Sequence, residues 1–216
     1  MFKRSPALAA IAIVLAASGL AAYAPEAPAV RIVILHTNDL HGRLLPFAYA
    51  EAGRGNLERE GVGGAARRAT LIRRLKRQAP DSTLLVDVGD VFTRGALTNA
   101  YEGLADIAAM NATGYQLAAI GNNEFKARDG VDAADWAGSQ KALLKVVRAS
   151  RFPWLCANLA DSSGKPPQGI RPTAVMKVGG LRVGFVGLTA PRSASYPQTR
   201  GWKITDPIAA AKVWVP

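Results

Sequence analysis

Short apolar runs alternate along the chain with segments whose apolar positions recur at helical spacing. Four runs are rich in aliphatic and β-branched residues and are short enough to be buried strands. They are RIVILH, STLLVDVG, QLAAIG and PWLCAN, which begin at residues 31, 82, 116 and 153. The segments 65–79, 101–114 and 133–150 between them have helical spacing. This alternation predicts an α/β fold with parallel strands that are covered by helices.

Two of the predicted helices have an apolar side that is expected to face the sheet. In the helix 65–79 the apolar residues are Ala65, Ala69, Ile72, Leu75 and Ala79, and the arginines that point elsewhere are Arg67, Arg73, Arg74 and Arg77. In the helix 133–150 the residues of one side are Trp136, Leu143, Leu144 and Val147. The helix 101–114 is expected to stop near Gly114.

The pattern changes after the fourth run. Two alternating runs, TAVMKV and LRVGFV, flank Gly179 and Gly180, which predicts a β-hairpin. The segment DPIAAAKVW then predicts a helix that begins behind an Asp206 cap and Pro207. The chain ends at Pro216 soon afterwards. We therefore expect it to stop within a domain and not at a domain boundary.

Residues 1–29 are predicted to be a signal peptide and a short linker. Lys3 and Arg4 precede the apolar stretch ALAAIAIVLAASGLAA, and small residues follow it, which is the order of a secretory signal. An uncleaved membrane anchor is the alternative, although the stretch is short and rich in alanine for a membrane span. We expect a secreted, periplasmic protein without stable membrane association after cleavage. Its domain is predicted over residues 30–216.

The composition is that of a globular chain with an excess of basic residues. Hydrophobic residues make up 49% of the 216 residues, and the net charge is +11. Much of this charge lies in the helix 65–79, where a solvated helix face is expected and a nucleic-acid surface is the alternative. No aromatic residue is interleaved with these arginines. We therefore expect no nucleic-acid partner and a small, anionic, phosphate-containing substrate. The sequence does not indicate the oligomeric state.

Cys156 is the only cysteine of the chain, so no internal disulfide is possible. It lies in the apolar run FPWLCANL and is expected to be a buried, inert thiol. The chain has two histidines, His36 and His41. His36 lies inside the first predicted strand and is expected to belong to the core, which leaves His41 as the histidine available for a site.

Polar side chains follow three of the predicted strands, where ligands gather in an open α/β sheet. They are Asp39 and His41 after the first strand, Asp90 after the second, and Asn122, Asn123 and Glu124 after the third. An imidazole, two carboxylates and an amide oxygen at one edge predict a mixed N/O metal site. Asp90 is suited to bridge two ions. The alternatives are ordinary: Asp39 as a loop cap, His41 on the surface, and Asp90 and Asn122 in turns.

The motifs ILHTNDLHG, LLVDVGD and AIGNNEF, in this order and spacing, resemble those of the calcineurin-like metallophosphoesterases. Within that family the chain is most similar to the secreted 5′-nucleotidase and UDP-sugar hydrolase group, over about residues 31–214. The resemblance implies an α/β fold in which layered metallophosphoesterase-type sheets are flanked by helices. It also implies metal-dependent hydrolysis of phosphoester or phosphoanhydride bonds in nucleotides or related compounds.

The resemblance further implies roles for the residues at the strand ends. Asp39 and His41 are expected to hold a first divalent ion, Asp90 to bridge two ions, and Asn122 to bind the second ion through its side-chain oxygen. Zn, Mn, Fe and Mg suit these ligands about equally. Glu124 is expected to brace the loop and not to act as a base.

Two departures from the family pattern bear on activity. Asn123 stands where the family has a histidine that stabilises the transition state and protonates the leaving group. An asparagine donates a hydrogen bond but delivers no proton, and the loss of a general acid costs about 10² to 10⁴ in rate. The family also takes histidine ligands from segments further downstream and binds the nucleoside with a C-terminal domain. We therefore expect this chain to be the N-terminal portion of the domain, with an incomplete second metal site.

Three interpretations are compatible with these features. The chain is the front part of an active phosphoesterase, or a catalytically impaired scaffold of the same family that binds metal or ligand. The third interpretation keeps the scaffold and changes the substrate, as in the thiosulfate-cleaving relatives, but the special residues expected for that change are absent. Lys126 stands where the family often has an aspartate, and it is expected on the surface.

Overall fold

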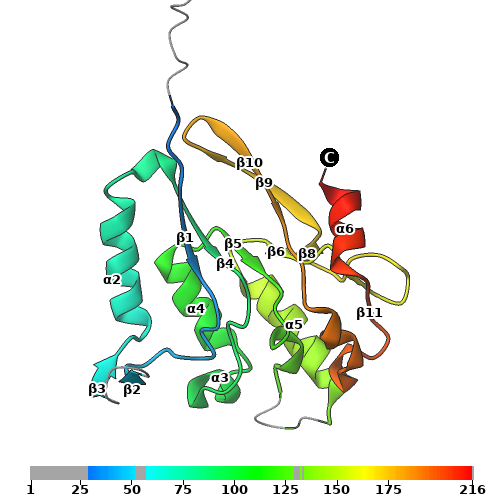
Figure 1. The fold of residues 1–216 in the computed structure, drawn as a ribbon. Coiled ribbons are helices and arrows are strands. Elements are labelled where there is room, and N and C mark those ends of the chain that lie inside the picture. Colours follow the sequence, from blue (N-terminus) through cyan, green and yellow to red (C-terminus); the bar gives the residue numbers. More distant parts are fainter. Residues whose placement is uncertain (1–28, 52–56, 129–131, 133, 216) are drawn as a thin grey trace, which may run out of the picture. The chain divides into compact units, whose positions relative to one another are not determined.

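The computed structural model describes residues 29–51, 57–128, 132 and 134–215, and Ile32–Pro216 form one compact unit. The predicted signal peptide falls almost entirely outside the described residues. A five-stranded parallel sheet with the order β1-β4-β5-β6-β8 forms the centre of this unit (Figure 1). Its strands are β1 (Val33–Thr37), β4 (Thr83–Asp87), β5 (Leu117–Ala119), β6 (Trp154–Leu155) and β8 (Ile170–Arg171). The first four are the four apolar runs, so the predicted parallel sheet is confirmed.

The predicted helices are also present. They are α2 (Ala65–Lys76), α4 (Leu104–Thr113), α5 (Trp136–Ala149) and α6 (Pro207–Trp214), together with the short α3 (Ala96–Ala100). Helix α4 ends at Gly114, which adopts the left-handed conformation (φ 85°) that glycine tolerates at a helix C-terminus. Helix α6 begins behind Asp206, whose carboxylate accepts a hydrogen bond from the backbone N–H of Ala209 at 2.7 Å.

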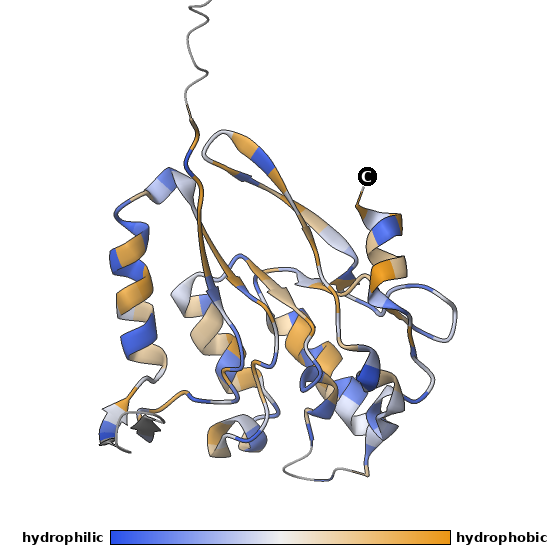
Figure 2. Ribbon diagram, viewed as in Figure 1, coloured by the Kyte–Doolittle hydropathy of each residue, from blue (hydrophilic) through white to orange (hydrophobic). Residues whose placement is uncertain are grey.

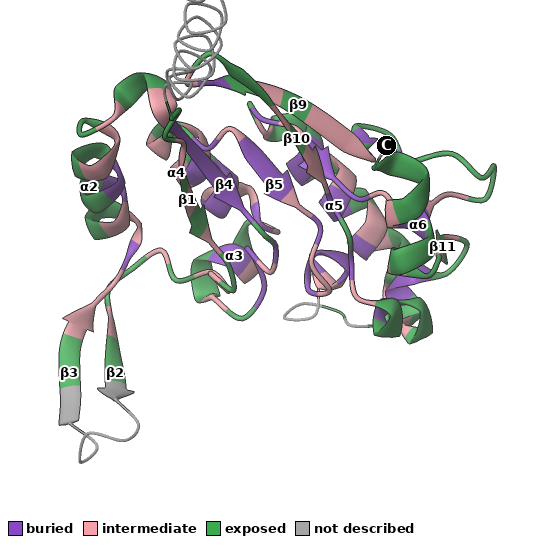
Figure 3. Ribbon diagram, turned by 45° about the horizontal axis from the view of Figure 1, so that its top comes forward, coloured by how far each residue is buried: buried purple, intermediate pink, exposed green. Residues whose placement is uncertain are grey.

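The alternation of side chains along the strands builds the main core. Leu85, Ala118 and Trp154 occupy neighbouring strands and pack in one cluster with Ile107 of α4 and Leu143 of α5. All five side chains are at most 1% exposed. Figure 3 shows β4 and β5 as buried, between helices and the hairpin strands. The helices therefore cover one face of the sheet.

An adjacent residue of each of these strands points to the opposite face of the sheet. Val86, Leu117 and Leu155 form a second cluster, and Ala174 and Phe185 pack against it. These two residues belong to a β-hairpin. It consists of β9 (Thr173–Val178) and β10 (Leu181–Val186), which turn at Gly179 and Gly180 as predicted. The hairpin thus covers part of the face that the helices leave open.

Two expectations about single residues are wrong. His36 is exposed, because its neighbour Leu35 faces the helices and the alternation turns His36 to the hairpin side. There it lines a cavity of about 380 Å³ with Ile34 and Phe185. Trp136 is 36% exposed, because it opens helix α5 beyond the edge of the core, and Arg200 packs over its ring at 5.5 Å. The buried residues of α5 are Ser139, Ala142, Leu143, Val146 and Val147.

The expectations for α2 and for Cys156 agree with the packing. In α2 the apolar Ala69 and Ile72 are buried, and the four arginines predicted to point elsewhere are exposed. Figure 2 shows the resulting alternation of hydrophobic and hydrophilic residues along α2. Cys156 is fully buried, and burial raises the pKa of its thiol to about 12. At neutral pH it is therefore a protonated, unreactive thiol.

Several short elements had no clear pattern in the sequence. They are the strand pairs β2 (Phe47–Glu51) with β3 (Leu57–Val62) and β7 (Leu159–Ala160) with β11 (Lys203–Ile204), and the 3₁₀ turns Pro80–Ser82, Glu124–Lys126, Pro191–Ser195 and Pro197–Thr199. Within the described part of the chain, no helix is both long enough and apolar enough to cross a membrane.

Candidate metal centre

Two loops at the carboxyl edge of the sheet bring the predicted ligands together. The loop after β1 carries Asp39 and His41, and the loop after β4 carries Asp90. Backbone hydrogen bonds join these loops, from Asp39 N–H to the oxygen of Gly89 (3.0 Å) and from His41 N–H to the oxygen of Asp90 (3.1 Å). The parallel pairing of β1 and β4 therefore continues past the strands and fixes the two loops side by side.

The backbone at this edge is held in an unfavourable conformation. Among the described non-glycine residues, six have positive φ, and they include Asp39 (52°), His41 (43°) and Asp90 (60°). Two more, Thr93 and Arg94, follow Asp90 closely. Left-handed backbone costs non-glycine residues about 1–2 kcal/mol each, and such strain concentrates at functional sites. The three residues with predicted metal-binding roles, Asp39, His41 and Asp90, therefore all have a strained backbone.

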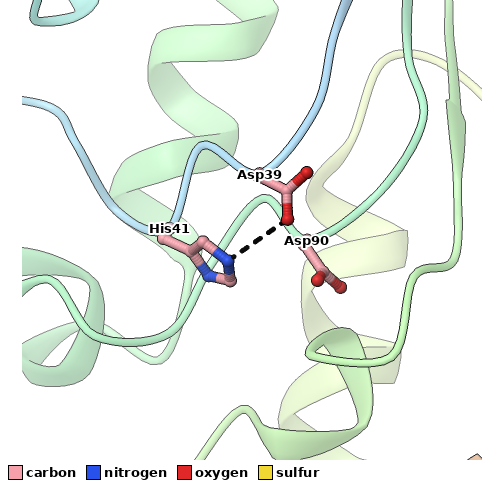
Figure 4. A group of neighbouring side chains, drawn as sticks. All are labelled: Asp39, His41 and Asp90. Atoms are coloured by element: carbon pink, nitrogen blue, oxygen red, sulfur yellow. Dashed lines mark ion pairs between the residues drawn. The ribbon is translucent and has the colours of Figure 1, made fainter. Parts of the chain in front are cut away.

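The three side chains lie close together, and His41 and Asp39 face each other (Figure 4). Asp39, His41 and Asp90 each offer one ligand atom, and these atoms lie within 4.8 Å of one another. His41 Nε2 is 3.5 Å from Asp39 Oδ1, and its buried Nδ1 has no hydrogen-bond partner among the described residues. Asp39 is 59% exposed and His41 only 16%, so the cluster opens to solvent on the aspartate side. One imidazole and two carboxylates suit a divalent ion of the Zn, Mn, Fe or Mg type.

Glu124 supports the loop of Asp90 through hydrogen bonds to its backbone. Its carboxylate is fully buried and accepts hydrogen bonds from three backbone N–H groups, those of Asp90 (2.9 Å), Val91 (2.7 Å) and Gly121 (2.7 Å). Burial raises the pKa of Glu124 to about 8, and the bonds from Asp90 and Val91 oppose that shift. These contacts make Glu124 a brace between the ends of β4 and β5, as the sequence suggests.

Asp87, the last residue of β4, is a second buried carboxylate near the site. The sequence did not indicate a role for it. It is 1% exposed and accepts hydrogen bonds from Thr37 Oγ1 (2.5 Å) and Gly89 N–H (2.8 Å). Burial raises its pKa to about 6. The sequence feature that could have revealed Asp87 is the position of an ionisable residue at the end of an otherwise apolar strand. It links the end of β1 to the loop that carries Asp90.

Glycines allow the ends of β4 and β5 to approach each other. A Cβ at Gly121 would lie 2.3 Å from Asp90 Oδ1, and a Cβ at Gly89 would lie 2.6 Å from the backbone nitrogen of Gly121. Gly89 also adopts a φ of 105°. The glycine after each strand is therefore needed for the close contact of the two loops.

The two adjacent asparagines have different partners. Asn123 is buried, and it donates to both oxygens of Asp90, from its backbone N–H (2.8 Å) and from Nδ2 (2.7 Å). Asn122 Oδ1, the predicted ligand atom, accepts a hydrogen bond from Arg192 at 2.9 Å. The structure thus clusters Asp39, His41 and Asp90 and attaches Asn123 to this cluster. The role of Asn122 as a ligand stays a prediction.

Several cationic side chains lie near the site, and one of them, Arg192, comes from a segment that the sequence did not connect with it. Arg192 lies 70 residues after Asn122, so only the fold brings the two together. Arg43 and Arg94 line a cavity of about 430 Å³ whose wall also includes Asp39 and His41. Lys126 lies with its Nζ 4.3 Å from the centre of the Tyr196 ring. The surroundings of the cluster are therefore cationic, which favours an anionic ligand.

The chain is similar to known phosphoesterases and nucleotidases. Residues 32–169 match a family model described as calcineurin-like phosphoesterase. A 5′-nucleotidase from Rattus norvegicus is 35% identical over 181 residues, which are 82% of this chain and 29% of the rat chain. A snake venom 5′-nucleotidase from Naja atra is 35% identical over 165 residues, which are 73% of this chain and 28% of that one.

Solved structures of nucleotidases are also similar to this chain. The crystal structure of a 5′-nucleotidase precursor from Thermus thermophilus matches with a TM-score of 0.69 and 32% identity, over 84% of this chain and 33% of that chain. The NAD nucleotidase of Haemophilus influenzae matches with a TM-score of 0.68 and 25% identity, over 84% of this chain and 31% of that chain. The chain spans about a third or less of the length of these similar proteins.

Proposed function

The chain belongs to the calcineurin-like phosphoesterase family, and from that premise we propose that it hydrolyses phosphoester or phosphoanhydride bonds in nucleotides or related compounds, with the help of divalent metal ions. The observation that carries the proposal is the convergence of Asp39, His41 and Asp90 on two strained, braced loops. A bound divalent ion supplies Lewis-acid activation of water and charge stabilisation at phosphate oxygens. The protein's part is to hold these ligands in place before the substrate arrives.

We assign the residues as follows. Asp39, His41 and Asp90 would hold a first divalent ion, and Asp90 and the side-chain oxygen of Asn122 would hold a second. A dinuclear centre is supported by the carboxylate of Asp90, which belongs to the cluster and also accepts hydrogen bonds from Asn123, the residue next to Asn122. Zn, Mn, Fe and Mg are all compatible with carboxylate, imidazole and amide ligands. The relatives named as 5′-nucleotidases support a small phosphate-containing substrate, and the N-terminal sequence supports secretion to the periplasm.

Asn123 directs the proposal toward anhydride substrates. Its amide nitrogen already donates to Asp90, and an amide delivers no proton. A phosphoanhydride leaves as a phosphate anion and needs little protonation, whereas the alkoxide from a nucleoside monophosphate needs a general acid. One solved relative is named an NAD nucleotidase, and NAD contains a phosphoanhydride. We therefore propose that anhydrides are cleaved in preference to monophosphates.

The same observation favours one alternative, which is a catalytically impaired scaffold that still binds metal. A buried Asn123 whose backbone and side-chain nitrogens both donate to Asp90 leaves the site without an evident proton donor. In this case the cluster of Asp39, His41 and Asp90 keeps its affinity for an ion, and hydrolysis does not follow.

Phosphate release from ADP, measured with and without added Mn²⁺, tests the proposal. Turnover that requires the ion, and that Asp90→Asn lowers by about 10²-fold or more, supports hydrolysis. Asp161→Asn is the matched control, because Asp161 is a partly exposed aspartate that accepts hydrogen bonds from Ser163 in its own turn. Binding of Mn²⁺ without turnover supports the impaired scaffold. Phosphate release that is indifferent to both the ion and Asp90 contradicts the proposal.

A further inference from the structure

We propose that Arg192 binds the second phosphate of a phosphoanhydride substrate, the one that leaves. This inference rests on the proposed function and deepens it, because it names the group that recognises the leaving half of the substrate. The reaction adds water across the bridging P–O bond. The bridging oxygen departs with the electron pair on the leaving phosphate, and the proton of the water passes to solvent.

The segment that carries Arg192 is fixed to the carboxyl edge of the sheet. It follows β10, and Thr189 just before it exchanges two hydrogen bonds with the buried Asn158, at 2.9 Å and 3.0 Å. Thr189 Oγ1 also donates to the backbone oxygen of Gly121 at 3.2 Å. Ser193, directly after Arg192, is fully buried. The arginine therefore extends from an anchored backbone and not from a loose surface loop.

A series of contacts connects Arg192 to the cluster of Asp39, His41 and Asp90. Asp90 clusters with Asp39 and His41 at one end, Asn123 donates to Asp90, and the neighbouring Asn122 accepts from Arg192. Two adjacent residues, Asn122 and Asn123, therefore connect Arg192 to Asp90. Two phosphates joined by one oxygen need a second anion site beside the first.

The guanidinium of Arg192 has spare capacity for this phosphate. It carries five N–H donors, and Asn122 Oδ1 takes one of them. Arg192 is exposed, and no ion pair joins it to a carboxylate among the side chains that the structure describes. Lys126, packed over Tyr196 of the same segment, adds a second positive charge. Arginine suits a phosphate because its donors form a planar fork.

The chemistry of the site needs such a charge. Asn123 leaves the site without a proton donor, so a departing phosphate keeps its full negative charge. A guanidinium stabilises that charge without transferring a proton. Arg43 and Arg94 also lie near the cluster, but they line the cavity on the side of Asp39 and His41. Arg192, by contrast, hydrogen-bonds directly to Asn122, a predicted ligand of the second ion.

Isothermal titration of the full chain, first with Mn²⁺ and then with imidodiphosphate or inorganic phosphate, tests the inference. Imidodiphosphate is a two-phosphate probe that resists hydrolysis. We expect Arg192→Gln to weaken imidodiphosphate binding about five- to tenfold and to change phosphate and Mn²⁺ binding less than about twofold. Arg200→Gln is the matched control, because it removes the same charge from an exposed arginine that packs over Trp136.

Each other outcome contradicts the inference in a distinct way. If Arg192→Gln weakens the binding of phosphate and imidodiphosphate equally, Arg192 contacts the first phosphate. If Arg192→Gln and Arg200→Gln have equal effects, Arg192 acts only through its long-range charge. A larger loss in Arg94→Gln would place the second phosphate in the cavity that Arg94 lines. Unaltered imidodiphosphate binding in Arg192→Gln, with Mn²⁺ bound, overturns the inference alone. A wild-type chain that binds no Mn²⁺ overturns the proposed function together with it.

Discussion

Asn123 donates hydrogen bonds to both carboxylate oxygens of Asp90, one from its backbone N–H at 2.8 Å and one from its side-chain amide at 2.7 Å. The pair joins the end of β5 to the end of β4 at the point where the predicted ligands converge. It also commits the amide nitrogen of Asn123, so this side chain orients Asp90 and contributes no proton. The chemistry expected of the site follows from this contact.

Replacing Asn123 by histidine is predicted to raise activity on nucleoside monophosphates more than on anhydrides. A histidine supplies the proton that an alkoxide needs, and a general acid is worth about 10² to 10⁴ in rate, while a departing phosphate gains little. The ratio of kcat/KM for AMP to that for ADP measures the effect. Asn123→Ala removes the amide without adding an acid, so it is expected not to raise this ratio. An equal gain on both substrates in Asn123→His would contradict the account.

Glu124→Gln is predicted to destabilise the chain by about 2–3 kcal/mol. The carboxylate accepts three backbone N–H groups, and an amide would present its NH₂ to at least one of these donors and leave it unsatisfied in a buried position. Urea unfolding followed by circular dichroism measures the free energy of unfolding. Glu60→Gln, at an exposed glutamate of β3, is expected to stay within about 0.5 kcal/mol of wild type. A similar result for Glu124→Gln would rule out the bracing role.

Asp106 is predicted to make stability depend on pH between about pH 4 and pH 6. It is 3% exposed, burial raises its pKa from 3.8 to about 6, and Thr98 donates a hydrogen bond to it at 2.7 Å. Because the folded state holds this proton more tightly than the unfolded state, its contribution is present below the unfolded pKa and is lost as the pH rises through about 6. The loss is at most about 3 kcal/mol.

The variant Asp106→Asn isolates this contribution, because it keeps an acceptor for Thr98 and does not titrate. Its free energy of unfolding is expected to rise relative to wild type as the pH increases from about 4 to about 7. Asp161→Asn serves as the control of opposite sign. The hydroxyl of Ser163 lowers the pKa of Asp161, so that variant is expected to fall behind wild type as the pH rises. A difference between Asp106→Asn and wild type that stays constant with pH would contradict the assignment.

Elements whose own side chains determine their structure were predictable from the sequence. The four apolar runs became β1, β4, β5 and β6, and the Gly179–Gly180 turn became the tip of the hairpin. Polar residues at the ends of parallel strands meet at one edge, so the approach of Asp39, His41 and Asp90 also followed from their places in the sequence. These are local patterns combined with one rule of topology.

Features that depend on distant segments were not predictable. Arg192 reaches Asn122 across 70 residues, and no motif joins the two. The exposure of His36 depends on how much of the sheet face the hairpin covers, which the strand pattern alone does not reveal. Trp136 opens α5 beyond the core edge, although its helical spacing suggested a buried position. The left-handed backbone of Asp39, His41 and Asp90, the predicted ligands, had no signal in the sequence, because none of them is a glycine.

The central claim is that Asp39, His41 and Asp90 hold a divalent ion, and equilibrium dialysis against Mn²⁺ followed by elemental analysis tests it most directly. Asp39→Ala and Asp90→Asn are each predicted to reduce the bound metal, while Asp161→Asn leaves it unchanged and circular dichroism shows that every variant is folded. A wild-type chain that retains the ion and two site variants that lose it would support the account. Metal content that is unchanged in both site variants would contradict it.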